Sequence, residues 1–536
     1  MKTLRTHALR HAFDLAGCPV HVRGWVRTVR RQKAVSFLEV NDGSSVKGCQ
    51  VVAPTAVVDL IQGLGVGCSV SVRGRAQVGR ASHGEIEVHV GGGSIGVSID
   101  GSENAEVTGD TENTESAVAD GAIDVVGPVD AASFPLQKKY QSLEFLRDHL
   151  HLRTRTNTAG AVLRVRHRVA SAVRRFLDRS DFIEVNTPII TANDCEGAGE
   201  LFEVRAAAAR GAESQEVGRD TGGETEGEAG AGMFFKLPVF LTVSGQMHAE
   251  ALACSMGRVY TFGPTFRAEN SHTSRHLAEF WMIEPEMAFA TMDDAIDIAQ
   301  GTIQATFHDV LEKNAEDVDF FGAQQVMAQK MKQKGQSQKK TKKTMMQQQH
   351  TPNHVSGDLD VARPPREVLE MLTSSSASFA RMTYTEAVAA LNTSGRPASQ
   401  VPAWGQDLSS DQERWLVEQH CGYTPLIVTD YPASVKPFYM RQNDDGKTVA
   451  AFDILLPGVG EVVGGSAREE RLDLLEVAMQ KNGIHGLEWY ADLRRHGSVP
   501  HAGFGVGMER LVMACTGVKN VRDVVPFPRT PGWCTL

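Results

Sequence analysis

Cysteine is scarce in this sequence, and the few residues present are scattered. The 536 residues include 8 cysteines and no CxxC pair, so a zinc knuckle is not expected. Sparse cysteine in a chain of this length fits a reducing compartment better than a disulfide framework. The basic N-terminus lacks a hydrophobic signal core, and a weak mitochondrial presequence is the alternative to a cytoplasmic protein. Because strand-like sequence starts almost at once, at Val20, we expect the cytoplasm.

The sequence also lacks long apolar runs and an excess of basic residues. No run approaches the ~20 apolar residues that a membrane-spanning helix needs, so no membrane partner is expected. The formal net charge is −10, and nucleic acid would therefore have to be bound by a local basic patch. One patch lies near the N-terminus, where Asp14 is the sole acid up to residue 38. Its cations are Arg23, Arg27, Arg30, Arg31 and Lys33.

Residues 20–97 alternate in hydrophobicity over short segments that are separated by turns. Asp42–Gly43 is typical of a hairpin turn, and residues 56–64 predict a short helix. Five strands with a helix between the third and the fourth are typical of the OB fold, so we assign residues 1–97 to an OB-type β-barrel. A generic β-domain is the alternative. The predicted strands are residues 20–26, 35–40, 49–53, 68–76 and 84–90.

Three segments of biased composition interrupt the chain. Residues 98–126 are acidic and rich in Ser, Thr and Gly, which predicts a mobile linker, and we assign residues 98–142 to a linker and hinge. Residues 205–232 consist mostly of Ala, Gly and Glu, and residues 328–350 are rich in Lys and Gln. We expect disordered insertions near both. The lysines of the second could contact RNA, although such a charged run is more often a solvated loop.

Residues 143–536 predict a second domain in which strands join in hairpins and helices lie outside them. Residues 162–181 form an amphipathic pattern, and residues 501–517 predict a strand that leads into a helix. This order favours an antiparallel sheet flanked by helices, and therefore the α+β class, over a doubly wound parallel sheet. Strands are expected near residues 182–190, 425–429 and 449–455, and helices near residues 292–312 and 409–420.

A hairpin over residues 258–289 has an unusually charged turn. Its middle contains Arg267, Glu269, His272, Arg275, His276 and Glu279. One guanidinium group can donate two parallel hydrogen bonds to two oxygens of a phosphate, so the turn suits a polyanionic ligand. The aromatic ring of Phe280 could stack on a flat ligand ring. The alternative is a solvated hairpin held by salt bridges.

The segment GFGVGMER (residues 503–510) superficially matches a dinucleotide-binding fingerprint. The spacing is G-x-G-x-G and not G-x-G-x-x-G, and the chain ends before a βαβ unit could follow. A nicotinamide site is therefore excluded. What remains is a glycine-rich strand that enters a helix, where a flat ring can approach the backbone and Arg510 can reach a phosphate.

These segments together resemble the motifs of the class II aminoacyl-tRNA synthetases. FRAE (residues 266–269) with RHLAEFWMIEPE (residues 275–286) resembles motif 2, and GFGVGMERL (residues 503–511) resembles motif 3. Residues 182–190 resemble motif 1, which forms the dimer interface in that family. The N-terminal barrel is typical of the aspartyl, asparaginyl and lysyl subgroup. The finer match is closest to the asparaginyl members, in CEGAGELF, VSGQ and GEVVGGSAREERLD.

The resemblance implies a reaction and its reactants. L-asparagine would be activated with ATP as an adenylate and then passed to tRNA(Asn), by a homodimer. Arg267 would contact the α-phosphate and Arg510 the γ-phosphate, and with Glu461 they are the implied catalytic residues. The ATP contacts would be Arg267, Glu269, Arg275, His276, Phe280, Glu461 and Arg510. Mg²⁺, which prefers oxygen ligands, would be bound by Asp453 and Glu461.

The resemblance also implies how the amino acid is selected. Aspartyl members have a lysine where this chain has Ala249, and that lysine pairs with the substrate carboxylate. An amide would leave a buried lysine unpaired, whereas Glu284 can accept a hydrogen bond from an amide and repel a carboxylate. Ala249 could equally serve only for packing. The implied asparagine-binding residues are Glu196, Ser244, Gln246, Ala249, Glu284 and Arg468.

The barrel would read the anticodon. By the same resemblance, Phe37 stacks on the central uridine, and Gln50 and Glu87 form hydrogen bonds with that base. Stacking on one base contributes roughly 1–3 kcal/mol. The alternative is that Phe37 belongs to the barrel core.

Other functions compete with this interpretation. An aspartyl enzyme, or one that charges both tRNAs, is disfavoured by Ala249. A tRNA-independent asparagine synthetase would not need the barrel. A non-catalytic, RNA-binding paralogue is disfavoured because Arg267 and Arg510 are both present.

Overall fold

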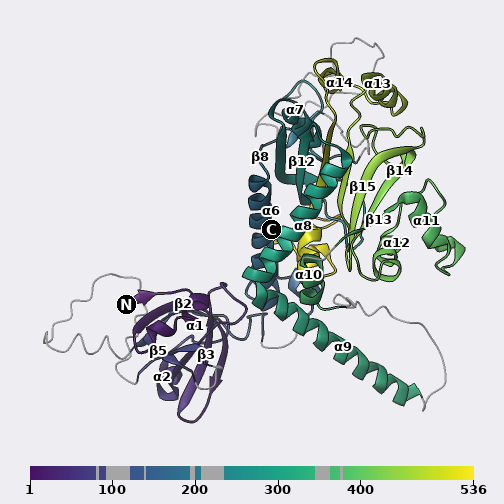
Figure 1. Ribbon diagram of the computed structural model, residues 1–536. Helices are drawn as coiled ribbons and strands as arrows, with labels where there is room; N and C mark the ends of the chain where they lie inside the picture. The colour runs from purple at the N-terminus through teal and green to yellow at the C-terminus, as the bar shows by residue number, and fades with distance from the viewer. Residues whose placement is uncertain are drawn as a thin grey trace, which may run out of the picture. The chain divides into compact units, whose positions relative to one another are not determined.

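The computed structural model describes residues 1–79, 84–91, 121–137, 141–192, 200–206, 234–343, 363–374 and 378–536. It consists of two compact units, Met1–Arg164 and Val165–Leu536 (Figure 1). The long helix α6, Asn157–Arg179, begins in the first unit and ends in the second. Each unit is built around its own β-sheet.

The first unit contains a closed barrel. Its 7-stranded sheet has the order β1-β2-β3-β4-β6-β5-β7, and β2 also pairs with β5, which closes the ring. The OB-type barrel predicted from the sequence is confirmed, as is the predicted helix between the third and fourth predicted strands, which is α2, Thr55–Leu60, between β4 and β5. The strands are β1 (Lys2–Thr3), β2 (Pro19–Arg31), β3 (Val35–Asn41), β4 (Cys49–Pro54), β5 (Ser69–Val78), β6 (Ile86–His89) and β7 (Ala122–Gly127). Before β2 lie α1 (Thr6–Arg10) and the 3₁₀ turn Phe13–Leu15.

Strict alternation along β3 places its residues on two faces. Leu38 and Val40 are fully buried in the barrel core, whereas Phe37, which precedes Leu38, is half-buried and lies on the other face. The alternative that Phe37 is a barrel-core residue is therefore wrong.

Part of the expected linker belongs to the sheet. Residues 122–127 form β7, which pairs antiparallel with β5. Ile123 is buried in the barrel core and Val125 packs against it, so these apolar residues attach the segment to the barrel. Residues 98–120 and 138–140 of the expected linker lie outside the described residues. The short helices α4 (Leu143–Arg147) and α5 (Leu150–Arg153) then precede α6.

The second unit is built on an 8-stranded sheet of order β13-β14-β15-β16-β17-β12-β11-β8. Its six central strands pair antiparallel, and the edge strands β13 and β8 each pair parallel with their neighbour. The predicted antiparallel sheet flanked by helices is confirmed. The strands are β8 (Ile183–Glu184), β11 (Arg258–Phe266), β12 (Glu279–Ala288), β13 (Ala380–Thr383), β14 (Leu426–Pro432), β15 (Thr448–Leu456), β16 (Gly460–Ala467) and β17 (His501–Gly507). A separate small sheet pairs β9 (Ile190–Thr191) with β10 (Phe240–Leu241).

Helices cover this sheet. α7 packs against β11 and β12, and α8 packs against β16 and β17 (Figure 1). α8 starts at a capping box formed by Thr291 and Asp294, which satisfies free N–H groups of its first turn. The helices of this unit after α6 are α7 (Gln246–Met256), α8 (Met292–Lys313), α9 (Ala315–Lys343), α10 (Pro365–Thr373), α11 (Tyr384–Asn392), α12 (Ser410–Trp415), α13 (Leu472–Lys481), α14 (Glu488–Arg495) and α15 (Met508–Thr516).

The backbone of residues 328–343 differs from the expected disordered insertion, because it continues α9 as helix. Ala, Gln, Lys and Met all have high helix propensity, which accounts for the difference. Residues 344–350, and almost all of the insertion predicted at residues 205–232, lie outside the described residues. Among the helices that the structure describes, none is long and apolar enough to cross a membrane.

Candidate active site

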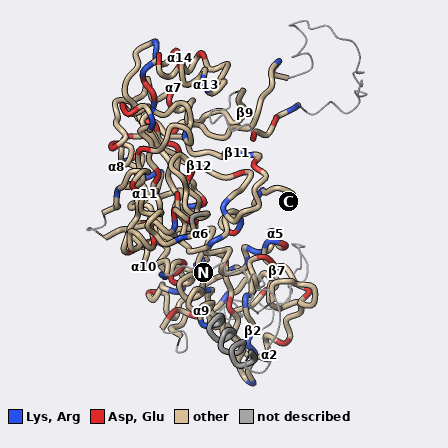
Figure 2. Tube along the Cα trace, turned by 90° about the vertical axis from the view of Figure 1, so that its right-hand side faces the viewer, with Lys and Arg blue, Asp and Glu red and all other residues tan. Residues whose placement is uncertain are grey.

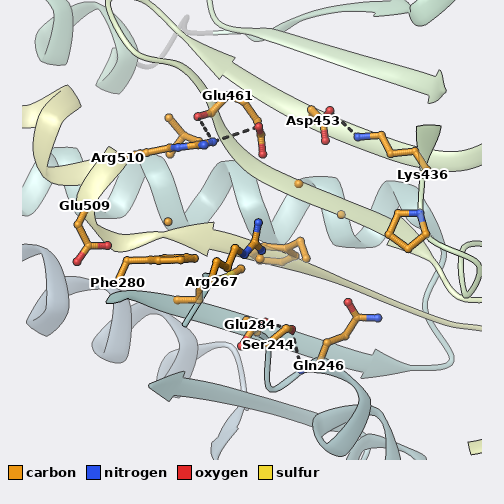
Figure 3. Close-up of a pocket in the computed structure, with 18 of the residues that line it drawn as sticks. Ser244, Gln246, Arg267, Phe280, Glu284, Lys436, Asp453, Glu461, Glu509 and Arg510 are labelled. Carbon is orange, nitrogen blue, oxygen red and sulfur yellow. Dashed lines mark hydrogen bonds and ion pairs between the residues drawn. The ribbon is translucent and has the colours of Figure 1, made fainter. Parts of the chain in front are cut away.

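A cavity of about 320 Å³ opens over the middle of the second unit's sheet (Figure 3). Three hairpin or turn segments line it: the β11–β12 hairpin, the β15–β16 hairpin and the passage from β17 into α15. The predicted site residues in its lining are Ser244, Gln246, Arg267, Glu269, Arg275, His276, Phe280, Glu284, Asp453, Glu461, Arg468 and Arg510.

The β11–β12 pairing explains how the motif residues meet. Phe266 pairs with Glu279 at the end of the ladder, and the Arg267 N–H donates to the Ala278 carbonyl at 3.0 Å. Arg267 therefore leaves β11 directly beside Phe280, and its guanidinium carbon lies 5.4 Å from the centre of that ring (Figure 3). A cation and a flat ring thus stand side by side in the lining.

Glycine keeps part of the lining open. Gly464 of β16 pairs with Gly505 of β17, where the two strands cross the cavity. A Cβ at Gly505 would meet the Met282 Cε at 2.6 Å. A side chain at this position would therefore displace its neighbour and fill space that a ligand can use.

One end of the cavity is rich in ion pairs. Arg510 Nη1 lies 3.1 Å from Glu461 Oε2 and donates to the Glu461 carbonyl at 2.9 Å (Figure 3). Arg275 Nη1 lies 3.5 Å from Glu413 Oε2, which also accepts from the Glu461 N–H at 3.1 Å. Burial and the nearby Glu461 charge raise the pKa of Glu413 to about 7. Both arginines are thus positioned by carboxylates at the end where the resemblance expects phosphates.

Asp453 and Glu461 face a common space. Asp453 Oδ2 accepts from Lys436 Nζ at 2.8 Å, and Glu461 Oε2 is paired with Arg510. Their other oxygens, Asp453 Oδ1 and Glu461 Oε1, lie 3.2 and 3.4 Å from the position that a Cβ on Gly464 would occupy. Burial raises the pKa of Asp453, whereas Arg510 and Lys436 outweigh burial and lower the pKa of Glu461.

The opposite end of the cavity contains a buried carboxylate that accepts hydrogen bonds from its neighbours. Glu284 accepts from the Ser244 hydroxyl and, at 2.9 Å, from the Gly245 N–H (Figure 3). Burial raises the pKa of Glu284. Arg468 donates to Ser466 Oγ at 2.7 Å and is ion-paired with Glu286. A carboxylate acceptor and a guanidinium donor therefore lie at the same end.

Comparison with known proteins gives the family. Residues 142–531 match the tRNA synthetases class II (D, K and N), and residues 20–92 match the OB-fold nucleic acid binding domain. An asparagine--tRNA ligase of Desulfotalea psychrophila is 45% identical over 520 residues, which are 96% of each chain. The chain belongs to the asparagine–tRNA ligase family of class II aminoacyl-tRNA synthetases. The resemblance inferred from the motifs is therefore confirmed.

Further relatives of this ligase family agree. The asparagine--tRNA ligase of Rhodopirellula baltica is 43% identical and covers 96% of this chain and 90% of its own. The crystal structure of asparaginyl-tRNA synthetase from Pyrococcus horikoshii, complexed with asparaginyl-adenylate, is 27% identical with a TM-score of 0.73. That similarity covers 99% of both chains.

Ala249 and Glu196 are the two predicted asparagine-binding residues that the described cavity lining does not include. Ala249 is fully buried and packs with Ala253 and Val259 in a small apolar cluster beside the cavity, outside its lining. Direct contact of Ala249 with the substrate thus has no support from its position, and packing accounts for the residue. Glu196 lies outside the described residues.

The structure adds residues that the sequence reasoning missed. Lys436 pairs with Asp453, 17 residues later in the chain, and Glu413 of α12 pairs with Arg275, 138 residues earlier. No local pattern singles out Lys436 or Glu413. Glu286 follows Glu284 by two residues on β12 and so shares its face, which strand alternation could have indicated. Glu250 follows Gln246 by four residues on α7, a spacing that brings two helix side chains together.

The predicted anticodon residues lie together in the first unit. Phe37 pairs with Val52 across β3 and β4, and the Arg30 guanidinium lies 4.6 Å from the centre of the Phe37 ring. Gln50 Nε2 donates to Glu87 Oε1 at 2.7 Å. Glu87 is buried, so it orients Gln50, which is more exposed.

Proposed function

We propose that the cavity activates L-asparagine with ATP and that the barrel selects tRNA(Asn) for the transfer of the asparaginyl group. The observation that carries this proposal is the arrangement of the two ends of one cavity. Arginines occupy one end, and a buried carboxylate and a guanidinium, complementary to the NH₂ and C=O of an amide, occupy the other. Arg267 stands in the same lining.

The first step needs two anions to be brought together. The carboxylate oxygen of asparagine attacks the α-phosphorus of ATP, the bond to the bridging oxygen breaks, and pyrophosphate leaves. Arg267 contacts both the attacking carboxylate and the α-phosphate and offsets charge that builds on phosphorus. In the second step, a hydroxyl of the terminal ribose of tRNA attacks the acyl carbon, and AMP leaves.

ATP is bound through its ring and its outer phosphates. Phe280 is half-buried and stacks on adenine, with Glu269 at the edge of the same site. Arg510 contacts the γ-phosphate, and Arg275 and His276 contact the outer phosphates. Glu461 and Glu413 pair with Arg510 and Arg275. These carboxylates hold the two guanidinium groups in place before the phosphates bind.

We also propose Mg²⁺ at Asp453 and Glu461. The two oxygens that face the space over Gly464 are the hard donors that Mg²⁺ prefers, and a Cβ at Gly464 would intrude on that space. Within the described part of the chain, no three His, Cys, Asp or Glu side chains form a site by themselves, so phosphate oxygens would complete the coordination. When bound, the ion neutralises phosphate charge.

The barrel supplies the tRNA contacts. β2 carries Arg23, Arg27, Arg30 and Arg31, which can bind the phosphate backbone (Figure 2). Phe37 stacks on the central anticodon base beside Arg30, and Gln50 reads its edge. The proposed site thus combines a stacking ring with basic residues, as is usual for single-stranded nucleic acid.

We further propose a homodimer in the cytoplasm. β8 is an edge strand of the catalytic sheet, and Ile183 in β8 is exposed, as are Ile189 and Ile190 near it in sequence. These residues lie in or next to the predicted motif 1, and a second copy would cover them. Sedimentation of the protein at several concentrations tests the dimer. The cysteines that the structure describes are free, as suits a reducing compartment.

The decisive test of the reaction is ATP–pyrophosphate exchange with each of the twenty amino acids, followed by charging of tRNA(Asn) and tRNA(Asp) transcripts. Exchange that depends on asparagine, and charging that is confined to tRNA(Asn), are the expected results. Preference for aspartate would overturn the assignment of the amino acid.

A further inference from the structure

A buried cluster of charged side chains lies directly behind the amino-acid end of the cavity. Glu250 on α7 stands at its centre and is fully buried. It follows Gln246 by one helical turn. The other members come from the β12, β16–α13, α14 and β17 regions, and they are Glu286, Arg468, Tyr490, Arg494 and His501.

Glu250 touches two residues of the cavity lining. Its Oε1 accepts from Gln246 Nε2 at 3.0 Å and lies 3.8 Å from Arg468 Nε. On the far side, its Oε2 accepts from Arg494 Nη2 at 3.0 Å and lies 3.1 Å from His501 Nε2. The carboxylate therefore connects the recognition groups to a rigid ionic support.

From this arrangement we infer that Glu250 is a positioning residue that determines specificity for an uncharged amide over a carboxylate. It does so by fixing the orientation of the Gln246 amide and by balancing the charge of Arg468. The inference rests on the proposed function of the cavity, whose substrate it explains in part.

The orientation of Gln246 follows from the chemistry of its partner. An ionised carboxylate only accepts hydrogen bonds, so the NH₂ group of Gln246 must point to Glu250. The carbonyl oxygen of Gln246 is then left for the cavity, whose lining includes this residue. An acceptor at this place suits the side-chain N–H groups of asparagine, whereas the ammonium, which aspartate shares, would not distinguish the two amino acids. The carboxylate of aspartate would need a donor there.

The charges around this end of the cavity also favour asparagine over aspartate. The buried carboxylates of Glu250, Glu284 and Glu286 stand near the guanidiniums of Arg468 and Arg494. Arg468 is therefore already balanced by two carboxylates, Glu250 and Glu286. A side-chain carbonyl of asparagine can accept from Arg468, but the carboxylate of aspartate would add a further buried negative charge.

The ionisation of the cluster supports this account. Burial would raise the pKa of Glu250, but Arg494, His501 and Arg468 outweigh it and lower that pKa, so Glu250 stays charged. Burial raises the pKa of Glu286 to about 7 even though Arg468 is adjacent. Because the surroundings already raise the pKa of Glu286, they also disfavour a second negative charge, such as the side-chain carboxylate of aspartate.

The test is Glu250→Gln in the full-length protein, which keeps the shape and removes the charge. A glutamine at this position can also donate, so the Gln246 amide can turn and present its NH₂ to the cavity. In ATP–pyrophosphate exchange we expect the KM for asparagine to rise and the ratio of kcat/KM for asparagine over aspartate to fall about tenfold or more. The KM for ATP should stay unchanged.

The matched control is Glu469→Gln. Glu469 is also buried and pairs with Arg471 at 2.6 Å, but it lies outside the cavity lining. We expect this variant to lose thermal stability and to keep the wild-type ratio. If Glu250→Gln also keeps the ratio while both substrates decline equally, Glu250 is merely structural and the inference is overturned.

A second variant covers the case in which Glu250→Gln does not fold. Glu250→Asp keeps the negative charge but withdraws it from Gln246. The expected result is a higher KM for asparagine with aspartate still largely rejected, because the charge remains. Loss of the rejection of aspartate in this variant would contradict the role of charge. A wild-type protein that prefers aspartate would instead overturn the proposed function, so the two failures are distinguishable.

Discussion

Lys436 Nζ lies 2.8 Å from Asp453 Oδ2 inside the cavity, and both side chains are largely buried (Figure 3). Burial alone would lower the pKa of Lys436, but the Asp453 charge outweighs it and raises that pKa. The ammonium therefore remains charged and occupies one oxygen of Asp453. The second oxygen is left facing Glu461, in the space where we propose Mg²⁺.

Lys436→Met should destabilise the protein, because it leaves a buried carboxylate without its cation. Removal of one partner of such a pair costs about 3–5 kcal/mol. The double variant Lys436→Met, Asp453→Asn removes both charges and should be more stable than the single variant. Thermal unfolding of the four proteins of this cycle measures the coupling, and a loss in the double variant equal to the sum of the two single losses would show that the pair contributes little.

Arg267→Ala should abolish adenylate formation and leave the fold intact. One such donor at the reacting phosphate contributes ~10²–10³ in rate. Arg258→Ala is the matched control, because Arg258 begins the same strand β11 at its other end and is exposed. Normal pyrophosphate exchange by a folded Arg267→Ala variant would contradict the assignment of motif 2.

Phe37→Ala should weaken charging of tRNA(Asn) and spare pyrophosphate exchange without tRNA, since the two processes use separate units. The loss of one stacking contact, roughly 1–3 kcal/mol, corresponds to about a 5- to 150-fold fall in kcat/KM for tRNA. Phe13→Ala, which changes an exposed ring of the same unit, is the control. Equal loss in charging and exchange would show that Phe37 supports the fold instead.

Deletion of residues 328–350 should leave asparagine activation nearly unchanged. Among the side chains of α9 that the structure describes, up to residue 330, the buried ones lie near its start and include Val318, Phe321 and Gln325, and residues 326 and 327 are already exposed. A large loss in pyrophosphate exchange would mean that the distal helix is structural. Weaker tRNA binding with a shallower dependence on salt would instead show that its lysines contact phosphate.

Much of the site could be predicted because its residues stand in short motifs that resemble those of class II synthetases, and within each motif they are close in sequence. Arg267 and Phe280 end and begin paired strands of one hairpin, and Glu284 follows Phe280 on the same face of β12. Strand alternation likewise located the barrel. These features depend on local backbone geometry, which a sequence pattern expresses directly.

The remaining features depend on contacts between distant segments. Lys436 reaches Asp453 across 17 residues, and Glu250 meets Arg494 and His501 across more than 240 residues. Such pairs depend on which strands and helices become neighbours in the fold, and no local spacing in the sequence predicts them. β7 was likewise hidden, since its few apolar residues follow a long acidic segment and are recognised only by the barrel core that they join.

Ala249→Lys should damage the use of asparagine far more than the binding of ATP. Ala249 packs with Ala253 and Val259, and one turn before it the Gly245 N–H contacts Glu284. A lysine there cannot remain in an apolar cluster without a partner, and Glu284 is the carboxylate that we expect it to reach. That pairing would occupy the acceptor for the substrate NH₂ and lower kcat/KM for asparagine by about 10² or more.

The matched control for this change is Ala249→Met, which has similar length and no charge. If crowding alone is responsible, both variants lose asparagine activity equally and neither gains aspartate activity. If pairing with Glu284 is responsible, the lysine variant loses more, and aspartate improves slightly because the carboxylate that repels it is neutralised. Pyrophosphate exchange with both amino acids, over a range of concentrations, distinguishes these results. Wild-type kinetics in the lysine variant would show that position 249 has no influence on the cavity.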